Sequence, residues 1–308
     1  MKHEAHGALA CGLRLGAAAL LTAVVATTAV AQETCGDLLA SFQKQATADL
    51  ATIVATGRKI TDGNTCDAAM RRRVGRAIAM AHYNESNKVP DAAGKLRMLE
   101  SGMQYAQHWM LMREIGALRE KVPDANGRPN RSGASLAYQA ALADIQSKDD
   151  VPNPPPAEEI QKLVRLAQQT RMLSDQFVRG DALMTRGVRD VAVEAVALPI
   201  QYVYNSDEMT PLGRQYADEA LKLLTDQGRP RVALIGHTDP KGGDQYNVEL
   251  SRRRAAAFKK FLVDKGYSAA SIETDGMGKS QPLQIENQSS YTQEEFFQML
   301  RRVELKFK

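Results

Sequence analysis

The chain has few of the residues from which catalytic and metal sites are usually built. It contains five histidines and three cysteines among 308 residues. His82 and His108 stand alone, with no acid or cysteine at the spacing of metal ligands. Hydrolysis needs paired carboxylates in a cleft, a zinc site or an activated serine or cysteine, and no such pattern is recognisable. We therefore expect no cofactor, no metal and no enzymatic activity.

Aromatic residues are also scarce, at 6% of the chain with a single tryptophan, and the formal net charge is only +4. A nucleic-acid interface would need a basic stripe interleaved with aromatic residues. The arginine run Arg71–Arg73 is interpreted instead as a solvated helix face. We exclude nucleic acid as a partner.

Only one long apolar run is present, Leu15–Val30, and it follows the basic residues Lys2 and Arg14. This pattern, ending in small residues at Ala31, is typical of a secretory signal peptide over residues 1–31. The run is short for a membrane span and has no stop-transfer flank. We expect an exported protein with no membrane span after cleavage. An uncleaved N-terminal anchor is the alternative.

Cleavage would leave Cys35 and Cys66 in an oxidising compartment, which predicts a disulfide. An unbroken helix from Cys35 to Gly57 would separate its ends by about 33 Å. Bridged Cα atoms lie within about 7 Å of each other. Either this helix breaks near Thr47, or Cys35 lies on an extended segment that folds back.

Apolar residues at three- and four-residue spacing predict a helical bundle over residues 32–150. The expected helices cover residues 38–54, 67–83, 96–122 and 136–146. Residues 96–122 are expected as one helix whose apolar face shifts part-way. A proline-rich linker and an amphipathic helix then occupy residues 151–187.

A second folded region is expected over residues 188–308, so the fold class is α+β. Its predicted order is strand, helix, strand, helix, strand, forming an α/β sandwich with a mixed sheet. The first two strands are expected to pair in parallel through a right-handed crossover. The expected strands are Leu198–Tyr204, Val232–Ile235, Ile272–Thr274 and Arg301–Phe307, and a helix is expected from Thr210-Pro211 to Gln227.

The most informative stretch follows the strand Val232–Ile235. Asp239 lies at the strand's carboxyl edge, and Arg254 lies about two turns into the next helix. Between them, Gly242 and Gly243 permit positive φ and close backbone approach. A carboxylate can hold an ammonium and a guanidinium can grip a carboxylate, which predicts a site for a zwitterion. A structural ion pair between the two is the alternative.

The motif G-H-T-D-x-x-G-x-x-x-Y-N-x-x-L-S-x-x-R-A runs from Gly236 to Ala255 and resembles the signature of the OmpA C-terminal domain. That domain also occurs in peptidoglycan-associated lipoproteins and flagellar stator proteins. The resemblance covers roughly residues 197–308. It implies non-covalent binding of peptidoglycan through the diaminopimelate of its stem peptide. The residues that the resemblance assigns to the ligand are Thr238, Asp239, Asn247 and Arg254, with Gly236, Gly242 and Gly243 setting the loop geometry.

The closing segment Arg301-Arg302-Val303-Glu304 also resembles the family, but two features depart from it. Leu300 stands where the family usually has asparagine, and Tyr291–Glu294 replaces its usual helix start. We expect the last helix to pack differently.

These features together predict a periplasmic, peptidoglycan-bound protein associated with the outer membrane. One alternative is a stator-like protein held by an uncleaved N-terminal helix. A cell-wall hydrolase is less favoured, because His237 is the only histidine near the motif and has no nucleophile or second ligand at a recognisable spacing. By elimination, we expect the helical region either to dock a partner protein of the envelope or to act as a spacer.

Overall fold

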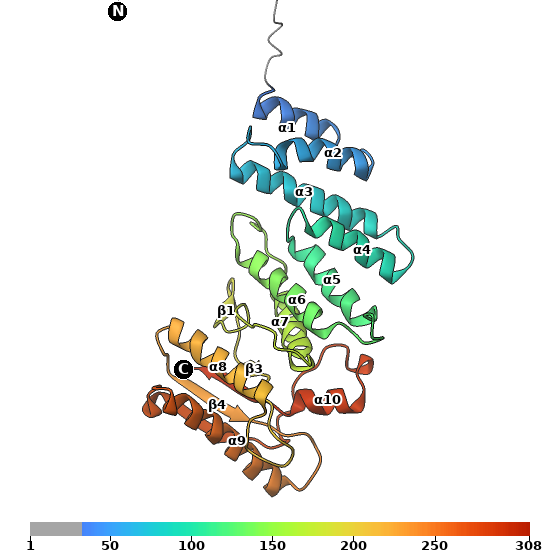
Figure 1. The fold of residues 1–308 in the computed structure, drawn as a ribbon. Coiled ribbons are helices and arrows are strands. Elements are labelled where there is room, and N and C mark those ends of the chain that lie inside the picture. Colours follow the sequence, from blue (N-terminus) through green and yellow to red (C-terminus); the bar gives the residue numbers. More distant parts are fainter. Residues whose placement is uncertain (1–32) are drawn as a thin grey trace, which may run out of the picture. The chain divides into compact units, whose positions relative to one another are not determined.

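The computed structural model describes residues 33–308 (Figure 1). The signal peptide predicted over residues 1–31, including the run Leu15–Val30, lies outside the described residues. The chain from Thr34 to Lys308 forms one compact unit. Within residues 33–308, no helix combines the length and the apolar character that a membrane crossing requires. The fold is α+β, with a helical region followed by a small mixed sheet and its covering helices.

The helical region is built from amphipathic helices, each of which contacts the next one along the chain. Most begin at an Asp, Asn or Thr whose side chain accepts a hydrogen bond from the first turn, as N-caps do. Their bounds are α1 (Cys35–Lys44), α2 (Leu50–Thr61), α3 (Ala68–Ser86), α4 (Ala92–Met103), α5 (Trp109–Lys121), α6 (Arg131–Gln146) and α7 (Ala157–Met172).

The first predicted helix is broken, and the break allows the predicted disulfide. α1 ends at Lys44 and α2 begins at Leu50, so the interruption includes Thr47. The chain turns back, and Cys35 and Cys66 are bonded with their Cα atoms 5.0 Å apart. The bridge adjoins a small core of its own, formed by Leu38, Phe42, Ile53, Ile60, Cys66, Val74 and Ile78.

The prediction of one helix over residues 96–122 is wrong. α4 ends at Met103, and α5 starts at Trp109 after His108, whose Nδ1 accepts from the Met110 N–H at 3.3 Å. The shift of the apolar face along this segment therefore marks a break between two helices.

The proline-rich stretch before α7 packs against the rest of the chain, since Val151 and Pro155 are buried. α7 contacts α6 on one side and the sheet on the other. One hydrophobic core includes Ile145 and Leu163 of the helical region together with Leu198 of the sheet. The division into separate domains at residues 151–187 stays a prediction.

The C-terminal sheet has the strand order β3-β6-β4-β5. β4 and β5 are parallel, whereas β6 is antiparallel to both of its neighbours. The expectation that the first two strands pair directly is therefore wrong, because the last strand lies between them. The bounds are β3 (Val196–Leu198), β4 (Val232–Gly236), β5 (Ile272–Gly276) and β6 (Val303–Phe307), with a separate hairpin of β1 (Gly187–Val188) and β2 (Val191–Ala192).

The first strand is also shorter and earlier than predicted. β3 ends just before Pro199, which has no N–H to donate to a neighbouring strand. Beyond it, Tyr202 forms only an isolated bridge with Met209. The alternation of Ile200, Tyr202 and Tyr204 thus belongs to an irregular segment beside the sheet.

Three helices complete this part: α8 (Pro211–Asp226), α9 (Asp244–Asp264) and α10 (Gln293–Leu300) (Figure 1). Thr210 caps α8 as predicted, accepting from the Gly213 N–H at 3.0 Å. α9 packs against β4 and β5. At β3, Ala197 is buried between Met172 at the end of α7 and Met299 of α10. The sheet is therefore covered by the helical region as well as by its own helices.

We predict that removing the disulfide loosens α1–α3. The bridge spans a sequence separation of 31 residues, for which loop closure in the unfolded chain is worth about 3 kcal/mol. The double variant Cys35→Ser, Cys66→Ser should lose about this much stability in α1–α3, measured by hydrogen exchange. Reduced wild-type protein is the control and should lose the same stability in α1–α3. Alkylation of both thiols in unreduced wild-type protein would contradict the prediction.

Candidate functional site

Glycine is required at two points in the segment from the end of β4 to the start of α9. A Cβ on Gly236 would overlap the carbonyl oxygen of Ser251, so strand and helix approach here as only glycine permits. Gly242 has φ +92°, a conformation that other residues rarely adopt. Gly243 differs from them, since its φ is −75° and nothing lies within 4 Å of where a Cβ would stand.

The loop that carries Asp239 is held by backbone hydrogen bonds on both sides. The His237 N–H donates to the Arg302 carbonyl at 2.9 Å, at the entrance to β6. The Thr238 N–H donates to the Gly278 carbonyl at 2.9 Å, in the loop after β5. The acid is thus presented at the carboxyl end of β4 from a fixed backbone.

The Asp239 carboxylate is paired with Arg301, the residue that directly follows α10. Its Oδ2 accepts from Arg301 Nη1 at 2.8 Å, and its Oδ1 accepts from the Lys241 N–H at 2.9 Å. The other arm of Arg301 donates to Glu294 at 2.7 Å. The side chain of Asp239 is 13% exposed. An ionised carboxylate has about four lone-pair sites, so a further donor can still be accepted.

Arg254 extends from α9 and is only 7% exposed. Its Nε donates to the Ser206 carbonyl at 3.0 Å, and its guanidinium carbon lies 5.1 Å from the centre of the Tyr202 ring. Burial lowers the pKa of Arg254, and the positive charge of Arg301 lowers it further. Tyr202 and Asp239 act in the opposite direction and raise it. An arginine keeps its charge nonetheless. Within residues 33–308, no oxygen accepts a hydrogen bond from either of its Nη atoms.

A pocket of about 260 Å³ opens beside this guanidinium. Its wall combines two positive side chains with amide and apolar groups. Asp239 does not line the pocket itself but pairs with Arg301, which does. No group of three or more His, Cys, Asp or Glu side chains among the described residues could hold a metal ion. The lining residues are Met172, Pro199, Gln201, Tyr202, Arg254, Gln298 and Arg301.

The two other residues assigned to the ligand by resemblance, Thr238 and Asn247, are buried. Asn247 donates from Nδ2 to the Lys241 carbonyl at 2.9 Å and so braces the turn before α9. Thr238 is 5% exposed, and its Oγ1 has no hydrogen-bond partner among residues 33–308. Neither residue lines the pocket.

Sequence reasoning missed Arg301, Gln298 and Met172, which line the pocket from α10 and from the end of α7. A signal for Arg301 was present in the closing Arg301-Arg302 pair, which was interpreted only as the start of a strand. Met172 lies far away along the chain and has no motif, so only the tertiary structure could identify it.

A buried charge cluster of His237, Arg302 and Glu304 lies next to the loop that carries Asp239. Arg302 donates from Nε to Glu304 Oε1 at 2.9 Å, and His237 Nε2 lies 3.5 Å from Glu304 Oε2. Burial raises the pKa of the Glu304 carboxyl, but His237 and Arg302 outweigh it and lower that pKa to about 2. The ionised carboxylate therefore helps to fix the strand end that carries Asp239.

Residues 201–295 match the model described as the OmpA family. This part of the chain is an OmpA-like domain. The matched range contains Asp239 and Arg254 but ends before Arg301, and β3 and β6 flank it.

Curated relatives share this domain. The chain is 37% identical over 106 residues to a peptidoglycan-associated lipoprotein of Pseudomonas aeruginosa, covering 34% of this chain and 59% of that protein. It is 35% identical over 80 residues to an outer membrane protein A of Bordetella avium, covering 26% of this chain and 41% of that protein. The matches thus span less than two thirds of these relatives' own lengths.

Similar solved structures include the peptidoglycan-associated lipoprotein from Burkholderia pseudomallei, with a TM-score of 0.31 and 20% identity over 38% of this chain and 91% of that one. Another is the C-terminal domain of Helicobacter pylori MotB, with a TM-score of 0.31 and 19% identity over 36% of this chain and 83% of that one.

We predict that Glu304 makes the OmpA-like domain sensitive to acid. Its pKa is lowered in the folded state from 4.5 to about 2. The stability that it contributes, on the order of 3 kcal/mol, is therefore present above pH 4.5 and is lost as the pH falls towards about 2. Urea unfolding across this range should show a smaller loss in Glu304→Gln than in wild type.

The matched control is Glu249→Gln, because Glu249 is an exposed carboxylate on α9. This variant should follow the wild-type profile. Identical pH profiles for wild type and Glu304→Gln would contradict the prediction.

Proposed function

We propose that the OmpA-like domain binds peptidoglycan non-covalently through the diaminopimelate of its stem peptides. The protein would then act in the periplasm, bound to the cell wall beneath the outer membrane, without cleaving its ligand. The observation that carries the proposal is the buried Arg254 guanidinium, whose two Nη atoms have no protein acceptor in residues 33–308 and which lines a pocket. Similarity to a peptidoglycan-associated lipoprotein supports it.

The chemistry of the pocket suits this ligand. The side chain of diaminopimelate ends in a carboxylate beside an ammonium. The two free Nη groups of Arg254 can donate two parallel hydrogen bonds to the carboxylate. Asp239 retains acceptor capacity for the ammonium after binding Arg301 and the Lys241 N–H. Each end of the zwitterion thus meets a group of opposite charge.

The expected affinity for a single stem is weak. Each charge-assisted contact contributes about 1.5–3 kcal/mol. After the cost of immobilising the ligand, this supports dissociation constants on the order of micromolar to millimolar. Peptidoglycan presents many stems, so rebinding to neighbouring stems would keep the protein on the wall.

We predict that Arg254→Lys binds purified peptidoglycan at least about tenfold less well than wild type, a loss of about 1.4 kcal/mol. Lysine keeps the charge but loses the planar fork and the Nε bond to Ser206. Co-sedimentation of the full chain with purified peptidoglycan measures the loss. Arg253→Lys is the matched control, because Arg253 is the neighbouring arginine of the same helix and its side chain is 41% exposed.

Asp239→Asn should also reduce binding, since it removes the charge that meets the ammonium. The same variant weakens the ion pair with Arg301, so thermal unfolding is measured in parallel. If Asp239 and Arg254 only brace the loop, both variants will melt earlier and bind in proportion to their folded fraction. Undiminished binding by well-folded Arg254→Lys would contradict the proposed function.

A further inference from the structure

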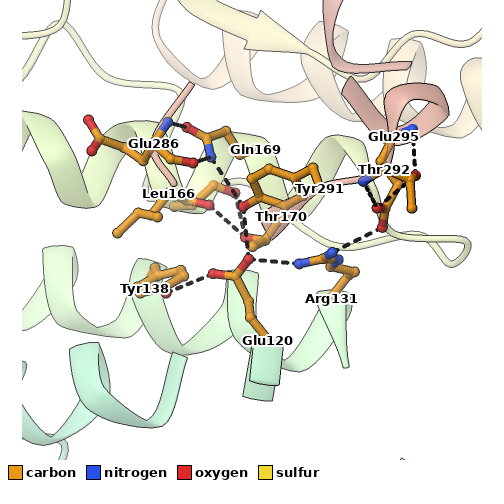
Figure 2. Close-up of polar contacts among 11 residues, drawn as sticks. Glu120, Arg131, Tyr138, Leu166, Gln169, Thr170, Glu286, Tyr291, Thr292 and Glu295 are labelled. Carbon is orange, nitrogen blue, oxygen red and sulfur yellow. Dashed lines mark hydrogen bonds and ion pairs between the residues drawn. The ribbon is translucent and has the colours of Figure 1, made fainter. Parts of the chain in front are cut away.

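A polar network joins the helical region to the segment that leads into α10 (Figure 2). Its centre is the Glu120 carboxylate at the end of α5, whose side chain is 13% exposed. Glu120 accepts from Arg131 Nη1 at 2.8 Å, from the Tyr138 hydroxyl at 2.9 Å and from the Tyr291 hydroxyl at 2.9 Å. Two helices of the helical region thus hold one tyrosine of the C-terminal part.

The tyrosine hydroxyls remain donors under physiological conditions. Burial raises the pKa of Tyr138 and of Tyr291, and the negative charge of Glu120 raises each of them further. Both hydroxyls therefore keep the proton that they share with the carboxylate. A buried carboxylate with three donors is well satisfied, and removing one donor is costly.

Further contacts fix the same segment from α7 and α6. Gln169 bonds the backbone of Glu286 twice, donating to its carbonyl at 3.2 Å and accepting from its N–H at 2.7 Å. Arg131 uses its second arm to donate to Glu295 at 3.0 Å and stacks over the Tyr291 ring at 4.8 Å. Figure 2 shows Gln169, Glu120 and Arg131 around Tyr291.

α10 connects the anchored segment to the ligand pocket. The helix runs from Gln293 to Leu300, starting with a capping box of Thr292 and Glu295. An eight-residue helix is about 12 Å long, so α10 connects the two ends over a short distance. Arg301 follows directly at its C-terminal end and holds Asp239, and Gln298 donates to the Met172 carbonyl at 2.9 Å. Both Gln298 and Met172 line the pocket.

We infer that the helical region completes the ligand site: it positions α10, and through α10 it positions Arg301 against Asp239. The inference rests on the proposed function, because it concerns the affinity of that same pocket. Tyr291 is a positioning residue, which acts on the ligand through Arg301 without touching it. The helical region is thereby part of the binding apparatus.

The test uses the full chain carrying Tyr291→Phe, which removes one hydroxyl and preserves the ring. We expect binding to purified peptidoglycan to weaken about three- to tenfold at a temperature where the variant is fully folded. Glu159→Gln is the matched control. It removes the ion pair of Glu159 on α7 with Arg113 on α5, whose 2.8 Å distance is close to the 2.9 Å of the bond between Tyr291 and Glu120. This control should bind like wild type.

A double-mutant cycle separates positioning from general destabilisation. In an Arg301→Ala background, Tyr291→Phe should weaken binding by less than twofold further, because the group through which it acts is gone. A full additional loss in that background would overturn the inference. So would wild-type affinity in Tyr291→Phe alone.

Hydrogen exchange provides a readout that needs no ligand. Tyr291→Phe should exchange faster than wild type in α10, with α9 unchanged, and Glu159→Gln should leave α10 unchanged. Unaltered exchange in α10 of Tyr291→Phe would overturn the inference whatever the binding result. Failure of the wild type to bind peptidoglycan would instead refute the proposed function.

Discussion

The buried charge of Arg254 is the constraint on which the candidate site depends. Burial removes water from a guanidinium, so the surrounding groups must replace it. The Ser206 carbonyl and the Tyr202 ring contact the guanidinium, while neither Nη atom has a protein acceptor within residues 33–308 and Arg254 lines the pocket. A carboxylate ligand would supply the missing partner. Asp239 pairs with Arg301 and not with Arg254, which supports the proposed recognition of an anion over an internal brace between the two motif residues.

This pairing ties the site to distant parts of the chain. Asp239 pairs with Arg301, and its loop adjoins the cluster of His237, Arg302 and Glu304. Arg301 in turn depends on α10, whose approach is held by a carboxylate of the helical region. The segment before α10, which departs from the family pattern, thus contains the residue that contacts the helical region. This segment is one of the links between the two regions, beside the ion pair of Arg171 with Glu219 and the shared hydrophobic core.

Much of the architecture could be predicted from local patterns. Capping by Thr210 and the strand–loop–helix unit around Asp239 depend on residues close in sequence. The break in the first helix was one of two alternatives raised by the predicted disulfide. The insertion of β6 between β3 and β4 could not be predicted, because strand order is set by long-range packing. The same limit applies to the site. Arg254 was found from its motif, but Arg301 and Met172 reach the pocket only through tertiary structure.

The central claim is that the pocket recognises a carboxylate beside an ammonium. Diaminopimelate and lysine both carry the terminal ammonium, and only diaminopimelate carries the adjoining carboxylate. Co-sedimentation of the full chain with two purified peptidoglycans, one with diaminopimelate and one with lysine in its stem peptides, tests this claim most directly. We expect at least about tenfold tighter binding to the diaminopimelate form, through the Arg254 fork. Equal binding to both would contradict the account.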